Sequence, residues 1–233
     1  MILDRPAATR GKGGAGWLDS RHTFSFAGYY DPAWMGFGPL RVINEDRVAP
    51  GAGFAPHRHA NMEILSYVLG GALAHRDDNG GGGVIRAGEL QWMGAGHGIE
   101  HSEYNGSDTE PVHFLQIWIQ PDRLNATPAY AQRAPIGSEA LRRWVVLASP
   151  DGAEGSIAIR QDARLLLTRL EAGSEIEYAL RPQRRYWVQV THGVVDVAGR
   201  TLAAGDAIGL AEEQGEIALV ASEAAEVLLF DLP

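Results

Sequence analysis

Residues 51–59 read Gly-Ala-Gly-Phe-Ala-Pro-His-Arg-His and end on two histidines, His57 and His59, that stand two positions apart. In an extended strand, residues two apart point to the same face, so both imidazoles can reach one point. A second pair with this spacing, His101 and Glu103, follows a glycine-rich segment. Two such pairs on facing strands predict one site with three imidazoles and one carboxylate. This donor set suits Fe, Mn, Co, Ni, Cu or Zn better than Ca or Mg, and an octahedral ion held by four ligands keeps two positions open.

A simpler interpretation competes with the metal site. An isolated His-x-His pair is more often two surface or hydrogen-bonded histidines, and here the second pair and the bounding glycines favour the metal. Spacing alone does not choose the carboxylate, because Glu63 follows His59 by four residues and is an alternative to Glu103.

Strand-like runs, rich in β-branched and aromatic residues, recur along the chain and predict an all-β protein. Clear examples are residues 40–44, 64–69, 114–119, 164–170 and 227–232. We find no helical period of any length. Periodicity alone does not separate a sandwich, a jelly roll and a barrel.

The run of strands is interrupted once. Residues 121–135 carry three prolines and predict a connection between two domains, 1–135 and 136–233, with a short helix at 138–143. Residues 23–26 alternate like a strand, and Asp-Asp-Asn-Gly at 77–80 predicts a turn.

Composition narrows the possible functions. The chain has 233 residues, is 45% hydrophobic and carries a formal net charge of −9. Such an acidic chain repels phosphate backbones, so we expect no direct nucleic-acid binding. It contains no cysteine, which excludes disulfides and thiolate ligands. Neither a signal peptide nor an apolar run long enough for a membrane span is evident, so we expect a cytoplasmic protein.

The metal-site residues fit a known motif. Gly51, five residues, His57-x-His59, three residues, Glu63, six residues and Gly70 match the first cupin motif, and Gly88, Gly96 and His101 fit the looser second one. Beyond the motifs, most of residues 17–135 resembles the pirin family, in particular its bacterial quercetin 2,3-dioxygenase-like branch. The matching stretches are His-Thr-Phe-Ser-Phe at 22–26, Tyr-Asp-Pro at 30–32, Met-Gly-Phe-Gly at 35–38, Leu-Arg-Val-Ile-Asn-Glu-Asp at 40–46, Met-Glu-Ile at 62–64, Leu-Gln-Trp-Met at 90–93 and Gly-Ile-Glu-His-Ser-Glu at 98–103.

The resemblance implies two cupin barrels in one chain. Residues 1–135 would form the metal-binding cupin and residues 136–233 a degenerate cupin. The second half resembles the family only weakly and contains no His-x-His, so we expect no metal there. In pirin-like proteins the fourth ligand is the glutamate two residues after the last histidine. That assigns the metal to His57, His59, His101 and Glu103, and leaves Glu63 either as a residue that supports a ligand or as a satisfied strand residue.

The resemblance also implies an activity. It points to an oxidoreductase, a metal-dependent dioxygenase that cleaves a flavonol such as quercetin with O₂. Glu103 would be the catalytic base, and Fe is our first choice of metal, with Cu, Ni, Mn, Co and Zn as alternatives. The competing hypothesis is a non-enzymatic, pirin-like regulatory protein that binds metal and acts through protein partners.

Other signals are weaker. The Gly-Lys-Gly-Gly segment at 11–14 is interpreted as flexible rather than as a phosphate loop. An aromatic-rich segment at 24–37 either shapes a pocket mouth or packs in the core. The remaining histidines are expected to make structural hydrogen bonds or to face solvent, although His97 is close enough in sequence to line the site; they are His22, His75, His97, His113 and His192.

Overall fold

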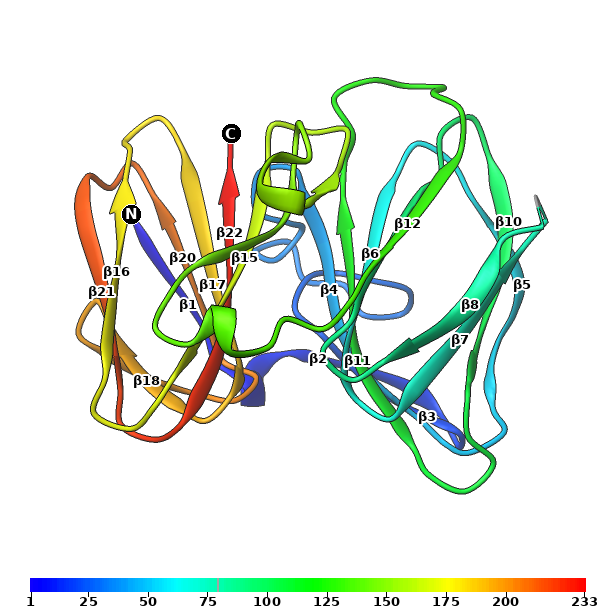
Figure 1. Ribbon diagram of the computed structural model, residues 1–233, viewed down its shortest axis with the longest axis horizontal. Coiled ribbons are helices and arrows are strands. Elements are labelled where there is room, and N and C mark those ends of the chain that lie inside the picture. The colour runs from blue at the N-terminus through cyan, green and yellow to red at the C-terminus, as the bar shows by residue number, and fades with distance from the viewer. Residues whose placement is uncertain (79) are drawn as a thin grey trace. The chain divides into compact units, whose positions relative to one another are not determined.

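Strands dominate the computed structural model, which describes residues 1–78 and 80–233 (Figure 1). The all-β prediction is confirmed. The chain divides into two compact units. We call the unit of Gly11–Pro135 and Ile159–Gln161 the N-terminal barrel. The C-terminal barrel consists of Met1–Arg10, Ile136–Ala158 and Asp162–Pro233.

The N-terminal barrel is built from two antiparallel sheets. The larger contains β2 (Gly11–Ala15), β3 (Leu18–His22), β4 (Leu40–Val48), β6 (Glu63–Gly70), β9 (Leu90–Gly94), β11 (Val112–Ile119) and β12 (Ala129–Arg133). The smaller contains β5 (Gly53–His59), β7 (Ala72–Asp77), β8 (Gly82–Arg86) and β10 (Ile99–Asn105). Their strand orders are β12-β9-β6-β11-β4-β3-β2 and β5-β10-β7-β8. The predicted turn at 77–80 includes Asn79, which lies outside the described residues.

The C-terminal barrel repeats this plan of seven plus four strands. Its larger sheet contains β1 (Ile2–Arg5), β13 (Val145–Ser149), β14 (Ile157–Ala158), β15 (Arg164–Leu170), β17 (Arg185–His192), β20 (Ala207–Ala211) and β22 (Ala225–Leu232). Its smaller sheet contains β16 (Glu175–Leu180), β18 (Val194–Val197), β19 (Arg200–Ala203) and β21 (Gly215–Ala221). The strand orders are β1-β20-β17-β22-β15-β13-β14 and β16-β21-β18-β19.

The first ten residues, which the sequence grouped with the first domain, belong to the C-terminal barrel. The reason is backbone pairing: β1 adds to the free edge of β20, with Ile2 opposite Leu210 and Arg5 opposite Ala207. Residues 1–78 and 80–233 also contain three short 3₁₀ turns, namely η1 (Ala7–Thr9), η2 (Ser138–Ala140) and η3 (Ala153–Gly155).

Two local predictions were wrong. The helix expected at 138–143 is only the single turn η2, because Arg142 adopts a left-handed φ of 53° that a helix cannot include. The strand expected at 23–26 is absent, since β3 ends at His22. Beyond it, the backbone closes on itself: Phe26 and Tyr29 exchange backbone hydrogen bonds of 3.0 and 2.9 Å around Ala27, whose φ is 50°.

The two barrels differ in what fills them. The C-terminal barrel contains a large apolar cluster drawn from both sheets, with residues such as Val188, Leu219 and Leu229. In the N-terminal barrel, one apolar cluster surrounds Phe114 and another surrounds Met93. A row of buried polar side chains on neighbouring strands crosses the larger sheet in register; its members are Gln91, Ser66, Gln116, Asn44 and His22. Part of the interior of the N-terminal barrel is therefore polar, as a binding or catalytic site requires.

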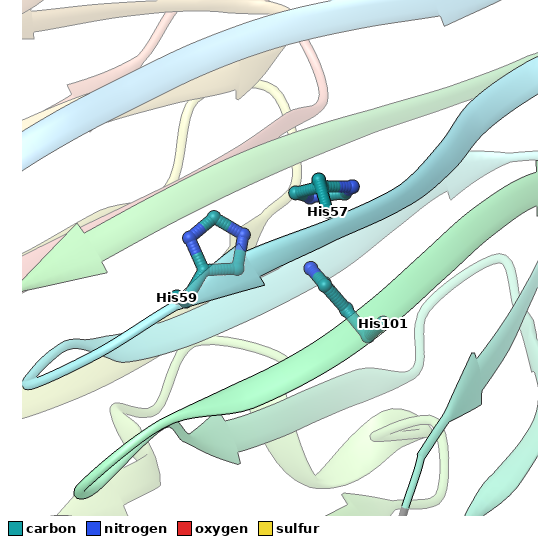
Figure 2. Close-up of side chains that lie close together, drawn as sticks. All are labelled: His57, His59 and His101. Atoms are coloured by element: carbon teal, nitrogen blue, oxygen red, sulfur yellow. The ribbon is translucent and has the colours of Figure 1, made fainter.

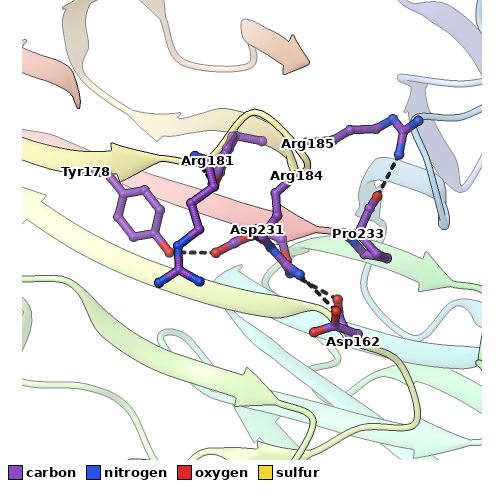
Figure 3. A network of polar contacts seen from close by, with 8 residues as sticks. Asp162, Tyr178, Arg181, Arg184, Arg185, Asp231 and Pro233 are labelled. Atoms are coloured by element: carbon purple, nitrogen blue, oxygen red, sulfur yellow. Dashed lines mark hydrogen bonds and ion pairs between the residues drawn. The ribbon is translucent and has the colours of Figure 1, made fainter. Parts of the chain in front are cut away.

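One polar network stabilises an end of the C-terminal barrel (Figure 3). Arg184 pairs with the Asp231 carboxylate and donates to Asp162 Oδ2 at 2.9 Å. Tyr178 Oη donates to the other carboxylate oxygen of Asp231 at 2.9 Å. The buried carboxylate of β22 is thus neutralised and hydrogen-bonded, as a charge in this position requires. Within the described part of the chain, no helix has the length and apolarity to cross a membrane.

Candidate metal centre

Three imidazoles converge inside the N-terminal barrel (Figure 2). His57 and His59 extend from β5, and His101 extends from β10. The nitrogen atoms that they offer all lie within 4.8 Å of one another. The two histidine-bearing strands are separate strands, as the spacing predicted, and they run antiparallel to each other. They are neighbours in the smaller sheet, where His101 lies directly opposite His57. Cross-strand pairing and the two-residue period of β5 together bring the rings to one place.

The electrostatics of this cluster favour a cation. Burial lowers the pKa of His101 to about 2 and that of His59 to about 4, with smaller contributions from the neighbouring rings. Both rings are therefore neutral at pH 7 and keep a lone pair free. His57 Nδ1 lies 2.8 Å from the Ala55 carbonyl oxygen, so this nitrogen carries the proton and Nε2 remains available.

The hydrogen-bond inventory gives a test of the fit. Neither ring nitrogen of His101 has a hydrogen-bond partner among the described residues, although the residue is only 2% exposed. Buried polar atoms are nearly always paired, so an orphaned imidazole requires an explanation. A divalent transition metal provides one, because neutral imidazole is among its preferred ligands. The residues present fit such an ion.

Glu103 lies two positions beyond His101 on β10 and is also buried. Its carboxylate falls outside the 4.8 Å group of imidazole nitrogens. It accepts hydrogen bonds from Gln116 Nε2 at 3.1 and 2.9 Å and from Ser66 Oγ at 3.3 Å. Burial raises the pKa of Glu103 to about 7, against the opposing effect of these donors. Its role as fourth ligand stays a prediction.

The alternative carboxylate, Glu63, has a different set of partners. One of its oxygens accepts two hydrogen bonds of 2.9 Å, from the indole Nε1 of Trp92 and from the backbone N–H of Arg160. The Arg160 guanidinium lies 4.0 Å from the second oxygen and sits over the Trp92 ring. Glu63 is not part of the imidazole cluster. The contacts make it an anchor for Arg160, a residue that is distant in sequence.

Sequence reasoning missed His75. This residue, on β7, is 4% exposed, and its ring centroid lies 5.2 Å from that of His101. The Tyr130 ring stacks on that of His75, with the ring centroids 5.5 Å apart and the planes at 7°. Neither ring nitrogen of His75 has a partner within the described chain. The sequence did carry a signal: Leu73 and His75 stand two apart in β7, so a buried Leu73 predicts a buried His75. Without a second histidine beside it, His75 did not indicate a metal site. His113, by contrast, makes a structural hydrogen bond of 2.8 Å to Glu45.

Comparison with known proteins agrees with this architecture. Residues 5–119 match the family described as Pirin, and residues 146–232 match the Quercetinase C-terminal cupin domain. The chain is 45% identical over 233 residues to the quercetin 2,3-dioxygenase of Escherichia coli K12, covering 100% of this chain and 99% of that protein. It is 41% identical to a pirin-like protein of Caulobacter vibrioides, with 99% of each chain covered. The crystal structure of the bacterial pirin YhhW from E. coli in complex with nickel(II) superposes with a TM-score of 0.95 at 45% identity, covering 100% of this chain and 99% of that one.

Proposed function

The chain belongs to the pirin family, and on that premise we propose that it is a metal-dependent dioxygenase that cleaves a flavonol such as quercetin with O₂. The observation that carries the proposal is the set of three imidazoles, two of them neutral through burial, together with the buried carboxyl group of Glu103 on β10, the strand that carries His101. The reaction class is that of the E. coli relative, a quercetin 2,3-dioxygenase.

We assign the metal to His57, His59, His101 and Glu103. The nickel complex of the E. coli pirin supports a divalent cation. We place Fe first, because a mixed imidazole and carboxylate donor set with open positions suits iron that handles O₂. Cu, Ni, Mn, Co and Zn remain alternatives. When bound, the metal would supply a Lewis acid that lowers the pKa of a substrate hydroxyl.

The chain's own residues would handle the proton. A carboxyl group whose pKa is close to 7 suits a general base at neutral pH, and burial raises the pKa of Glu103 to about 7. Glu103 would take the proton of the flavonol 3-hydroxyl on a carboxylate oxygen. Gln116 and Ser66 fix the plane of that carboxylate. The resulting flavonolate is electron-rich and reacts with O₂; both oxygen atoms enter the opened product and one ring carbon leaves as carbon monoxide.

The test is the loss of the flavonol absorption band with metal-loaded protein in air and under argon. We expect loss of the band and release of carbon monoxide only in air, and only with metal. Glu103→Gln should reduce the rate by a factor of 10² to 10⁴, the usual contribution of a general base. Tight metal binding without any oxygen-dependent loss would overturn the proposal and favour the regulatory alternative.

A further inference from the structure

The C-terminal barrel holds a cavity of about 280 Å³ that no part of the proposed chemistry uses. All of its lining residues belong to this barrel, most of them to β15, β16, β17 and β22. Its walls carry three arginines and two aspartates, so the cavity is net positive in a chain whose formal charge is −9. The polar residues that matter for binding are Arg164, Tyr178, Arg181, Arg184, Tyr186 and Asp231.

The cavity has a counterpart in the N-terminal barrel, because the larger sheets of the two barrels share one strand order and one register. Trp118, the last residue but one of β11, lies opposite Ile64 of β6. Asp231, the last residue but one of β22, lies in the same way opposite Tyr186 of β17, and its other neighbour is Arg164. Asp231 therefore takes the place of Trp118, the residue whose ring contacts a histidine of the candidate metal centre.

The smaller sheets give the same correspondence. His59 is the last residue of β5 and pairs with the first residue of β10. Leu180 is the last residue of β16 and pairs with the first residue of β21. Two positions earlier, Tyr178 takes the place of His57. The C-terminal barrel thus has a phenol and a leucine where the other barrel has two imidazoles, and the surrounding arginines suit this position to an anion instead of a cation.

Two of the three guanidinium groups are available to such an anion. Arg184 is neutralised, because it pairs with the carboxylates of Asp231 and Asp162. Arg164 and Arg181 line the same cavity and are exposed, and within the described chain their side chains form neither an ion pair nor a hydrogen bond. Figure 3 shows the Arg181 side chain beside the Tyr178 hydroxyl. A guanidinium offers paired N–H donors that match the oxygens of a carboxylate or a phosphate.

A buried hydroxyl adds a third donor. Tyr186 is 1% exposed and lines the cavity. Its Oη accepts a hydrogen bond of 2.8 Å from the backbone N–H of Arg181, and no acceptor for its own proton is present among the described residues. Tyr178, by contrast, donates its proton to Asp231. A phenol can donate as well as accept, and a buried donor without an acceptor is costly. Tyr186 is therefore placed to donate to a ligand oxygen.

We propose that this cavity binds a compact dianion through its carboxylate or phosphate oxygens. Arg164 and Arg181 hold the oxygens from the exposed side, and Tyr186 donates from the buried wall. Two unpaired guanidinium groups balance two negative charges. A volume of about 280 Å³ is small for a ligand pocket, which favours a short dicarboxylate or a phosphate over a nucleotide. The proposal does not depend on the dioxygenase activity.

Isothermal titration calorimetry with malonate, and separately with inorganic phosphate, tests the site at constant ionic strength. We expect at least one of the two anions to bind the metal-loaded protein with a Kd of about 1 mM or lower. The tighter of the two identifies the preferred group. Malonamide, which has the shape of malonate without its charge, should bind about tenfold more weakly or less. Absence of saturable binding by both anions, or equal binding of malonamide and malonate, would overturn the proposal.

Arg164→Gln and Arg181→Gln provide the residue-level test. Each removes one unpaired guanidinium and should weaken the anion about tenfold or more, the loss of a charge-assisted contact. Arg143→Gln is the matched control, because Arg143 is an exposed arginine of the same barrel that does not line the cavity. Wild-type affinity in both test variants, or equal weakening in the control, would contradict the assignment.

Two further measurements separate this site from other effects. Malonate should raise the midpoint of thermal unfolding in the wild type and in Arg143→Gln more than in the two test variants, which also shows that each variant folds. His59→Ala, which is expected to lose the metal, should keep its affinity for the anion. Loss of anion binding in that variant would assign the anion to the metal centre and overturn the proposal. Because no measurement requires turnover, failure of the dioxygenase proposal and failure of the anion site are seen separately.

Discussion

The side-chain amide of Gln116 donates hydrogen bonds to both carboxylate oxygens of Glu103, at 3.1 and 2.9 Å. Ser66 Oγ closes the arrangement, because it lies 3.3 Å from Glu103 Oε1 and 3.1 Å from the Gln116 carbonyl oxygen. Glu103 belongs to the smaller sheet, but the residues that hold its carboxylate, Gln116 and Ser66, belong to the larger sheet. With Glu103 as the proposed fourth ligand, Gln116 and Ser66 would be the groups that orient it for the metal.

Gln116→Leu removes both donors at nearly constant volume. We expect the affinity for Ni(II) at pH 7 to fall by about 10- to 100-fold, the usual cost of losing a group that orients a ligand. Titration with the metal measures it. Ser66→Ala, which removes a single longer contact, should have a smaller effect. Wild-type affinity in Gln116→Leu would show that Glu103 does not depend on this amide.

Metal binding should depend on pH through Glu103. Its pKa is raised to about 7 by burial, so below this pH a cation must first displace the proton. Affinity for Ni(II) should therefore rise between pH 6 and 8, by up to about tenfold per unit in the acidic part of the range. Glu103→Gln should bind more weakly and lose this component of the pH dependence. An unchanged profile in the variant would assign the proton to another group.

Asp46 makes a separate prediction about stability in the metal-free protein. Burial raises its pKa to about 7, chiefly by desolvation and against a hydrogen bond from Ser20. Its folded-state pKa lies above the unfolded value, so the folded protein retains a proton that the unfolded chain has lost. The stability contributed by this proton is present below about pH 4 and is lost as the pH rises to about 7. Relative to the wild type, Asp46→Asn should gain stability over this interval in urea unfolding measured at several pH values; parallel curves would contradict the assignment.

His59→Ala should remove most of the bound metal with little loss of folding. His59 is only half-buried and lies outside the apolar clusters around Phe114 and Met93. Its loss should therefore weaken metal binding much more than it lowers the stability of the fold. Elemental analysis and thermal unfolding measure the two effects. His192→Ala is the control, since that exposed histidine lies in the C-terminal barrel. Full metal occupancy in His59→Ala would count against the site.

Glu63 and Glu103 should respond differently to substitution. Glu63→Ala leaves Trp92 Nε1 and the Arg160 N–H without their acceptor, which should lower the free energy of unfolding by about 1–3 kcal/mol. Metal content should be unchanged. Glu63→Gln keeps an acceptor oxygen and should lose less stability. Loss of metal from either variant, at equal folding, would place Glu63 among the ligands.

Local patterns in the sequence account for much of this architecture. The two-residue period that defines strands also predicts that His57 and His59 share a face, and one cross-strand pairing brings in His101. Neither the pairing itself nor the hydrogen bonds of Glu63 could be read in the same way. They join residues far apart in the chain, such as Glu63 and Arg160, and a local period carries no information on such partners.

The segment after β3 shows that a local pattern can also predict the wrong structure. Residues 23–26 alternate like a strand, but Ala27 turns the chain back, so Phe26 lines a cavity instead of extending a sheet. His75 was missed because its importance depends on rings from two other strands, Tyr130 and His101. An alternating pattern predicts which side chains are buried, but it does not predict which residues they contact.

Each barrel includes a segment from the other half of the chain: β1 completes a sheet in the C-terminal barrel, and Ile159–Gln161 belong to the N-terminal one. A cut at residue 135 would thus deprive β20 of its edge partner and Glu63 of the Arg160 amide. Neither half of the chain therefore contains all the segments of one barrel. Gene fission, or exchange of one half between relatives, would have to carry these short segments along, which ties the inheritance of the two halves together.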